Sequence, residues 1–167
     1  MKYRVYLAGP DVFYPDAFER GDRLKALCRT YGFEGLFPLD NVIEECEAIL
    51  MARAIREANL KLIDRADAVI ANLEPFRGCE PDSGTVFEIG YAAALGKSVI
   101  GYADDLRTLK ERLCEHQGLE SAASHDAGGL LIEDFGWSHN LMFSELVRAR
   151  SAEDALKLLH RERAASR

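Results

Sequence analysis

The sequence lacks any run of 18 apolar residues, and its N-terminus passes from MKYR directly into VYLAGP without a long apolar segment. A membrane-spanning helix needs about 20 mostly apolar residues, and a secretory signal peptide needs an apolar central region. We therefore expect no membrane partner and a cytoplasmic location.

Positive charge is also scarce, because 21 Lys and Arg residues face 28 Asp and Glu residues and leave a net charge of -7. A protein that binds nucleic acid or an anionic membrane nonspecifically needs a basic surface to meet phosphates. This composition argues against both partners. A small-molecule ligand is favoured instead.

Metal-binding patterns are absent from the sequence. The four cysteines include no C-x-x-C pair, the four histidines include no H-x-x-x-H pair, and the acidic residues follow no recognisable metal-loop spacing. We expect neither a metal ion nor an organic cofactor. The thiols expected to be free are those of Cys28, Cys46, Cys79 and Cys114.

Short apolar runs alternate with amphipathic stretches along all 167 residues, of which 48% are apolar and 29% charged. This pattern predicts a single domain over 1–167 with an α/β fold, a doubly wound, flavodoxin-like five-stranded parallel sheet with helices on both faces. The predicted strands are 3–8, 33–37, 66–73, 98–103 and 129–132. The predicted helices are 16–31, 45–63, a helix within 80–97, 106–116, and 141 to the end with a break near 150–151, after which a C-terminal helical tail follows.

Polar residues cluster after the predicted strands, where the carboxyl ends of a parallel sheet bind ligands. Asp67 is harder to place, because it begins the third strand. The residues in or just beyond the carboxyl ends are Tyr6, Asp11, Asp40, Asn41, Arg77, Asp82 and Glu88.

Glu88 has two interpretations. Thr85-x-x-Glu88 fits a capping box, in which the two side chains satisfy backbone N–H groups at a helix start. On these residues alone a structural role is slightly favoured. The other interpretation is chemistry, because a carboxylate at a helix N-terminus stays ionised and can trap a positively charged carbon.

Several motifs together resemble the nucleoside 2-deoxyribosyltransferase family. They are Y-L-A-G-P near the N-terminus, P-L-D-N at 38–41, N-L-x-x-I-D-x-A-D at 59–67, D-S-G-T-x-x-E-x-G-Y-A at 82–92 and N-L-M at 140–142. The resemblance implies transfer of a 2-deoxyribosyl group between nucleobases, so that the partners are a 2'-deoxynucleoside and a free nucleobase. It implies that Glu88 is the nucleophile, which favours the chemical interpretation of this residue.

The resemblance also implies the other site residues. Tyr6 would donate a hydrogen bond to Glu88, and Asp67 would act on the base as a catalytic residue. Asp82 would bind the sugar hydroxyls, while Asn140 and Met142 would complete the site of a neighbouring subunit in a homo-oligomer. Asp40 and Gly9, which belong to two of the motifs, are further candidates for substrate binding.

The residue expected to recognise the base differs from that of the pyrimidine-accepting members of the family. These members have a glutamine where this chain has Val42. The segment 75–85, PFRGCEPDSGT, resembles the purine-accepting branch. Two alternatives stay open: a hydrolase of nucleosides or deoxynucleoside 5'-monophosphates, and a binding module without catalysis. The hydrolase relative binds phosphate with a Gly/Ser-rich first loop, whereas Gly9-Pro10-Asp11 offers few N–H donors and a negative charge.

Overall fold

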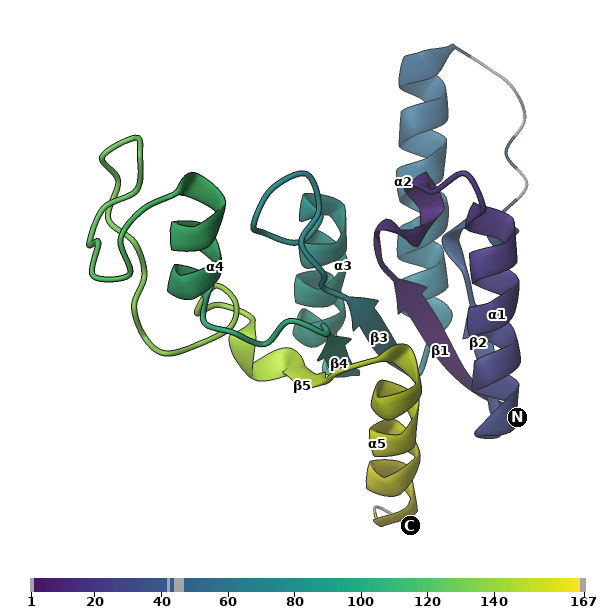
Figure 1. Ribbon diagram of the computed structural model, residues 1–167. Coiled ribbons are helices and arrows are strands. Elements are labelled where there is room, and N and C mark those ends of the chain that lie inside the picture. Colours follow the sequence, from purple (N-terminus) through teal and green to yellow (C-terminus); the bar gives the residue numbers. More distant parts are fainter. Residues whose placement is uncertain (1, 42, 44–46, 166–167) are drawn as a thin grey trace.

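The computed structural model describes residues 2–41, 43 and 47–165, and it contains a five-stranded, all-parallel sheet (Figure 1). The strand order β2-β1-β3-β4-β5 is that of a flavodoxin-like sheet, so the predicted fold class is confirmed. The strands are β1 (Tyr3–Ala8), β2 (Phe33–Leu36), β3 (Ala68–Asn72), β4 (Ser98–Tyr102) and β5 (Val147–Ala149). The helices are α1 (Ala17–Thr30), α2 (Ala48–Arg65), α3 (Ser83–Ala94), α4 (Leu109–Gln117) and α5 (Ala152–Ala165).

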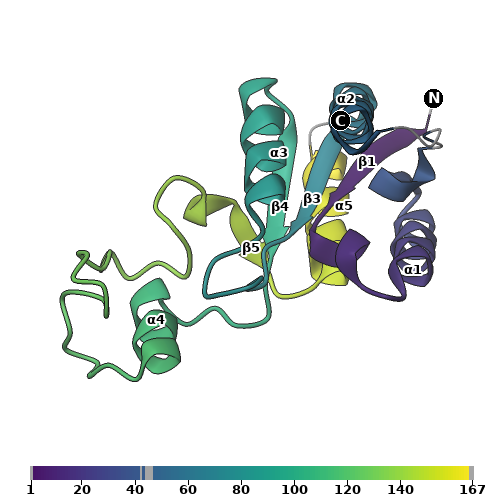
Figure 2. The ribbon, with the colours of Figure 1, turned by 90° about the horizontal axis from the view of Figure 1, so that it is seen from above.

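Alternate residues of each strand pack against different helices, because successive side chains of a strand point to opposite faces. Val5 and Leu7 of β1 belong to the apolar core that contains Cys28 of α1 and Leu156 of α5. Tyr6 and Ala8 belong to the core that contains residues of α2 and α3. Helices therefore cover both faces of the sheet, as Figure 2 shows, and the face under α2 and α3 receives Tyr6.

A close approach between strands fixes the turn after β1. Gly9 has a φ of 155°, and a Cβ atom added to it would lie 2.7 Å from Cβ of Asn72 at the end of β3. Any larger residue would push these strand ends apart. The short 3-10 helix Pro10–Phe13 follows and continues over the carboxyl ends of the strands.

The fifth strand lies elsewhere than predicted. The run 129–132 is not a strand of the sheet, since Leu130 and Leu131 are 70% and 76% exposed and Leu131 makes only an isolated bridge to His125. The edge strand is Val147–Ala149, which pairs with β4. The helix predicted from residue 141 is consequently wrong over 141–149, and helix α5 begins after the expected break.

The C-terminal helix α5 is an integral part of the core, because Ala155, Leu156 and Leu159 are buried. The chain between β4 and β5 instead extends away from the sheet and carries α4 (Figure 1). Two buried side chains attach this extension: Arg112 donates to the carbonyl groups of Cys79 and Ser138, and His139 bonds to the carbonyl of Leu73. Within the described residues, none of the helices combines the length and apolar character needed to cross a membrane.

Candidate active site

A buried tyrosine holds the carboxyl group of Glu88. Tyr6 is fully buried in β1, and its hydroxyl group donates a hydrogen bond of 2.7 Å to Oε1 of Glu88. Glu88 lies in the second turn of α3, which begins at Ser83. This hydrogen bond thus joins strand β1 to helix α3.

Burial makes the carboxyl group of Glu88 a weaker acid than that of an exposed glutamate. Desolvation is the largest cause that raises its pKa, to about 7, and the negative charge of Asp82 raises it further. The hydrogen bonds from Tyr6 and Asn59 act in the opposite direction. Desolvation thus outweighs the expected effect of the helix N-terminus, because Glu88 lies beyond the first turn, and the carboxyl group ionises near neutral pH.

Tyr6 remains a hydrogen-bond donor over the whole range in which Glu88 titrates. Burial is the main cause that raises the pKa of its hydroxyl group, and the neighbouring carboxylate of Glu88 raises it further. The phenol consequently keeps its proton and always directs it at Oε1.

Two cavities, of about 300 and 290 Å³, border Glu88. The first is also lined by residues of the turn after β1, of the segment after β2 and of the start of α3, among them Gly9, Phe13, Pro38, Leu39, Asp82 and Thr85. The second lies between α2 and α3 and is also lined by Ala52, Arg56, Leu60 and Phe87. Glu88 can therefore contact a small molecule held at the carboxyl ends of the strands.

The helix cap is provided by Asp82. Its Oδ2 atom accepts hydrogen bonds from the backbone N–H of Thr85 at 2.8 Å and from the Thr85 hydroxyl group at 2.9 Å. The predicted capping box between Thr85 and Glu88 is thus wrong, since α3 starts two residues before Thr85. Glu88 takes no part in capping the helix, so its carboxyl group is available to react with a substrate.

Asp67 lies at the opposite end of the sheet from this site. It precedes β3, where its carboxylate accepts a 2.7 Å hydrogen bond from the backbone N–H of Arg4 and its own N–H donates to the Arg4 carbonyl group. Gly9 and Asp82 follow the carboxyl ends of β1 and β3. The structure does not bring Asp67 to Glu88, and the expected role on the base is not compatible with this position.

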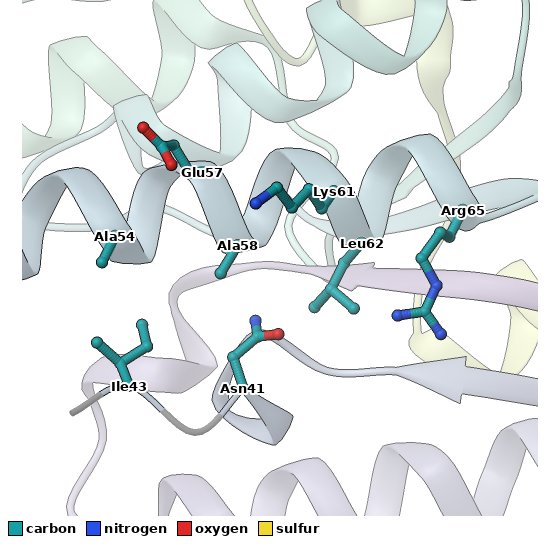
Figure 3. Close-up of a pocket in the computed structure, with 8 residues that line it drawn as sticks. All are labelled: Asn41, Ile43, Ala54, Glu57, Ala58, Lys61, Leu62 and Arg65. Atoms are coloured by element: carbon teal, nitrogen blue, oxygen red, sulfur yellow. The ribbon is translucent and has the colours of Figure 1, made fainter.

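Asp40 and Asn41 also lie outside the two cavities that contain Glu88. Asp40 accepts hydrogen bonds from Lys25 at 2.6 Å and from the backbone of Phe37 at 3.0 Å, which stabilise the turn after β2. Asn41 lines a separate cavity against α2 (Figure 3). Val42, the residue expected to alter base recognition, is outside the described residues.

Asn140 and Met142 lie outside the two cavities beside Glu88 of the same chain. Asn140 donates to Glu133 at 2.9 Å and accepts from the backbone N–H of Met142. Met142 is 81% exposed, although its side chain is apolar.

The comparison with known proteins identifies the family of the chain. The family model described as nucleoside 2-deoxyribosyltransferase matches residues 5–142. The chain belongs to this family. It is accordingly a glycosyl-transferring enzyme.

Individual relatives cover most of the chain. The structure of a 2-desoxiribosyltransferase from Leishmania mexicana has 37% sequence identity and a TM-score of 0.78, and the match covers 95% of this chain and 97% of that one. An uncharacterized protein of Schizosaccharomyces pombe is 34% identical in an alignment of 161 positions, and the match covers 86% of this chain and 76% of the yeast protein. A Bacillus psychrosaccharolyticus 2-deoxyribosyltransferase, 20% identical with a TM-score of 0.52 over 89% of this chain and 98% of that one, shares the fold.

Two residues of the site were not predicted from the sequence. Phe13 is 57% exposed, lines the first cavity and stacks on Phe76 at a centroid distance of 5.3 Å. Asn59 lines both cavities and donates to Glu88. The helical spacing could have revealed Asn59, because it lies between Ile55 and Ile63 on one stripe of α2.

The raised pKa of Glu88 predicts a pH-dependent gain in stability for Glu88→Gln. Its pKa is about 7 in the fold against 4.5 without burial, so the wild type loses stability as pH rises through this window. Glutamine does not ionise, so the variant should gain up to about 3 kcal/mol in free energy of unfolding above pH 7 and little near pH 4. Urea denaturation at about pH 5 and about pH 8 measures this difference.

Glu57→Gln is the matched control, because Glu57 is exposed on α2 and borders neither of the cavities that contain Glu88. An equal gain for Glu88→Gln at both pH values would contradict the raised pKa.

Proposed function

We propose that this enzyme transfers a 2-deoxyribosyl group from one nucleobase to another through a covalent intermediate on Glu88, with purines among the accepted bases. The observation that carries the proposal is the hydrogen bond from Tyr6 to Oε1 of Glu88 beside a cavity of nucleoside-like size, about 300 Å³. A carboxylate held in one orientation is what a nucleophile requires.

In the first half-reaction an oxygen of Glu88 attacks the anomeric carbon. The bond from that carbon to the base nitrogen breaks, and its electron pair leaves with the base. The departing base takes up a proton and becomes the free base. In the second half-reaction the nitrogen of another base attacks the same carbon, loses its own proton and releases the carboxylate. Two displacements retain the configuration, as in retaining glycosidases.

Asp82 is proposed to bind the sugar. Its Oδ2 atom is engaged by Thr85 in the helix cap, so Oδ1 is the oxygen left to accept a hydrogen bond from a sugar hydroxyl group. Gly9 borders the same cavity, where the absence of a side chain lets a substrate approach the backbone. Asp67 is left out of this scheme because of its place at the other end of the sheet.

Phe13 supports the assignment of nucleobases, and of purines in particular, as ligands. Its exposed ring borders the first cavity and is backed by Phe76, and the guanidinium group of Arg77 lies over both rings at 5.4 and 4.7 Å. Flat bases stack on such rings, and a purine has the larger surface. The likeness of segment 75–85 to the purine-accepting branch agrees with this.

The first loop favours transfer over hydrolysis of a nucleotide. Asp11 is buried beside Gly9, where it pairs with Arg20 at 3.1 Å and accepts a hydrogen bond from Asn72. The negative charge opposes a phosphate group at this position, and the nearby arginine is already engaged.

Asn140 and Met142 are proposed to complete the site of a neighbouring subunit. The second cavity beside Glu88 is mostly apolar, and Phe87 at its edge is 53% exposed. The exposed Met142 side chain offers a matching apolar surface, with Asn140 beside it as a polar group for the sugar.

Transfer is tested with 2'-deoxyinosine, with and without excess adenine, and the products are separated by chromatography. We expect 2'-deoxyadenosine only when adenine is present, and a loss of at least about three orders of magnitude in Glu88→Ala, because the nucleophile is removed. Hypoxanthine without transfer would indicate a hydrolase. No turnover by the folded protein would indicate a binding module.

Subunit sharing is tested by co-expressing Glu88→Ala and Asn140→Ala, each inactive alone. If Asn140 serves the neighbour, mixed dimers contain one site with both residues intact, so activity should return to about a quarter of wild type in a random mixture. Continued inactivity of the mixture, with subunit mixing shown by mass spectrometry, would contradict the shared site.

A further inference from the structure

Asn59 is a half-buried polar residue of α2. It occupies the same helical stripe as Ile55 and Ile63 and borders both cavities that contain Glu88. Its Nδ2 atom donates a hydrogen bond of 3.5 Å to Oε1 of Glu88. Its Oδ1 atom is buried and has no hydrogen-bond partner among the described residues.

This arrangement is unfavourable for the fold alone. A buried carbonyl oxygen without a partner has lost its hydrogen bonds to water without replacing them, which destabilises the folded state. Leucine has nearly the same shape and would bring no such penalty. A polar residue kept at a site where it reduces stability points to a function.

The two hydrogen bonds on Glu88 end on the same oxygen. Tyr6 and Asn59 both donate to Oε1, from β1 and from α2, while Oε2 receives no hydrogen bond from the described residues. An ionised carboxylate only accepts hydrogen bonds, so it favours the amide orientation in which Nδ2 faces Glu88.

We propose that Asn59 is a positioning residue, which together with Tyr6 holds Oε1 of Glu88 and thereby presents Oε2 as the oxygen that attacks the anomeric carbon. This inference rests on the proposed function, because it assigns the attacking atom of that reaction. It also explains the unsatisfied Oδ1, since the amide is oriented by the needs of the carboxylate.

The charged and titratable groups that face Glu88 are Tyr6 from β1, Asp82 from the start of α3 and Arg56 from α2. The hydrogen bond from Asn59 lowers the pKa of Glu88. Its removal should therefore raise the pH at which the nucleophile becomes ionised, and the acid limb of the activity profile should move in the same direction.

Asn59→Leu is the decisive variant. We expect kcat to fall by about 10- to 100-fold with KM changed by less than about 3-fold, because the nucleophile is misplaced while the substrate contacts are kept. The acid limb of kcat should move to higher pH, and the thermal midpoint should be equal to or above that of the wild type. A structural role would instead lower the midpoint.

Two control variants complete the experiment. Tyr6→Phe removes the shorter hydrogen bond to the same oxygen and should shift the acid limb further than Asn59→Leu does. Lys61→Met changes an exposed residue of α2 that lines only the separate cavity of Figure 3, and it should leave kcat and the pH profile unchanged.

An unchanged kcat in Asn59→Leu, a rise in KM alone or a lowered thermal midpoint would overturn the inference. The positioning can also be measured without turnover, by carbon-13 NMR titration of the Glu88 carboxyl group in wild type and Asn59→Leu. An upward shift in the variant supports the contact even if no substrate is converted, whereas identical titrations refute it.

Discussion

The hydrogen bond between Tyr6 and Glu88 is the interaction on which the site depends. It forms because alternate residues of β1 face opposite layers, so that Tyr6 points beneath α2 and α3. The same burial that orients the carboxyl group raises its pKa to about 7. Ionising Glu88 therefore opposes stability, and the hydrogen bonds from Tyr6 and Asn59 offset part of this cost. The ionised site therefore lowers the stability of the fold.

Much of this arrangement could be predicted from the sequence. The alternation of apolar runs and amphipathic stretches predicts the parallel sheet, and the first four strands lie where the pattern places them. Because carboxyl ends of parallel strands meet at one edge, Gly9, Asp82 and Glu88 could be brought together without coordinates. The family motifs then added the pairing of Tyr6 with Glu88.

Other features depend on tertiary contacts that no local pattern encodes. The run at 129–132 is as apolar as a strand, yet the edge of the sheet is formed by Val147–Ala149. A shift of the helix start made Asp82 the cap in place of Thr85. Asp67 belongs to a family-like motif, but it lies at the amino end of β3. Asn59, from the same motif, lies in α2 and donates a hydrogen bond to Glu88. Motif membership therefore does not establish position in the site.

The proposed reaction is tested most directly by looking for the covalent intermediate. The enzyme is mixed with a 2'-deoxynucleoside without acceptor base, quenched with acid, digested and analysed by mass spectrometry. If Glu88 is the nucleophile, the peptide that contains Glu88 carries one added 2-deoxyribosyl group, which is lost when a free base is added before the quench. Transfer without any such adduct, or an adduct on another residue, would contradict Glu88 as the nucleophile.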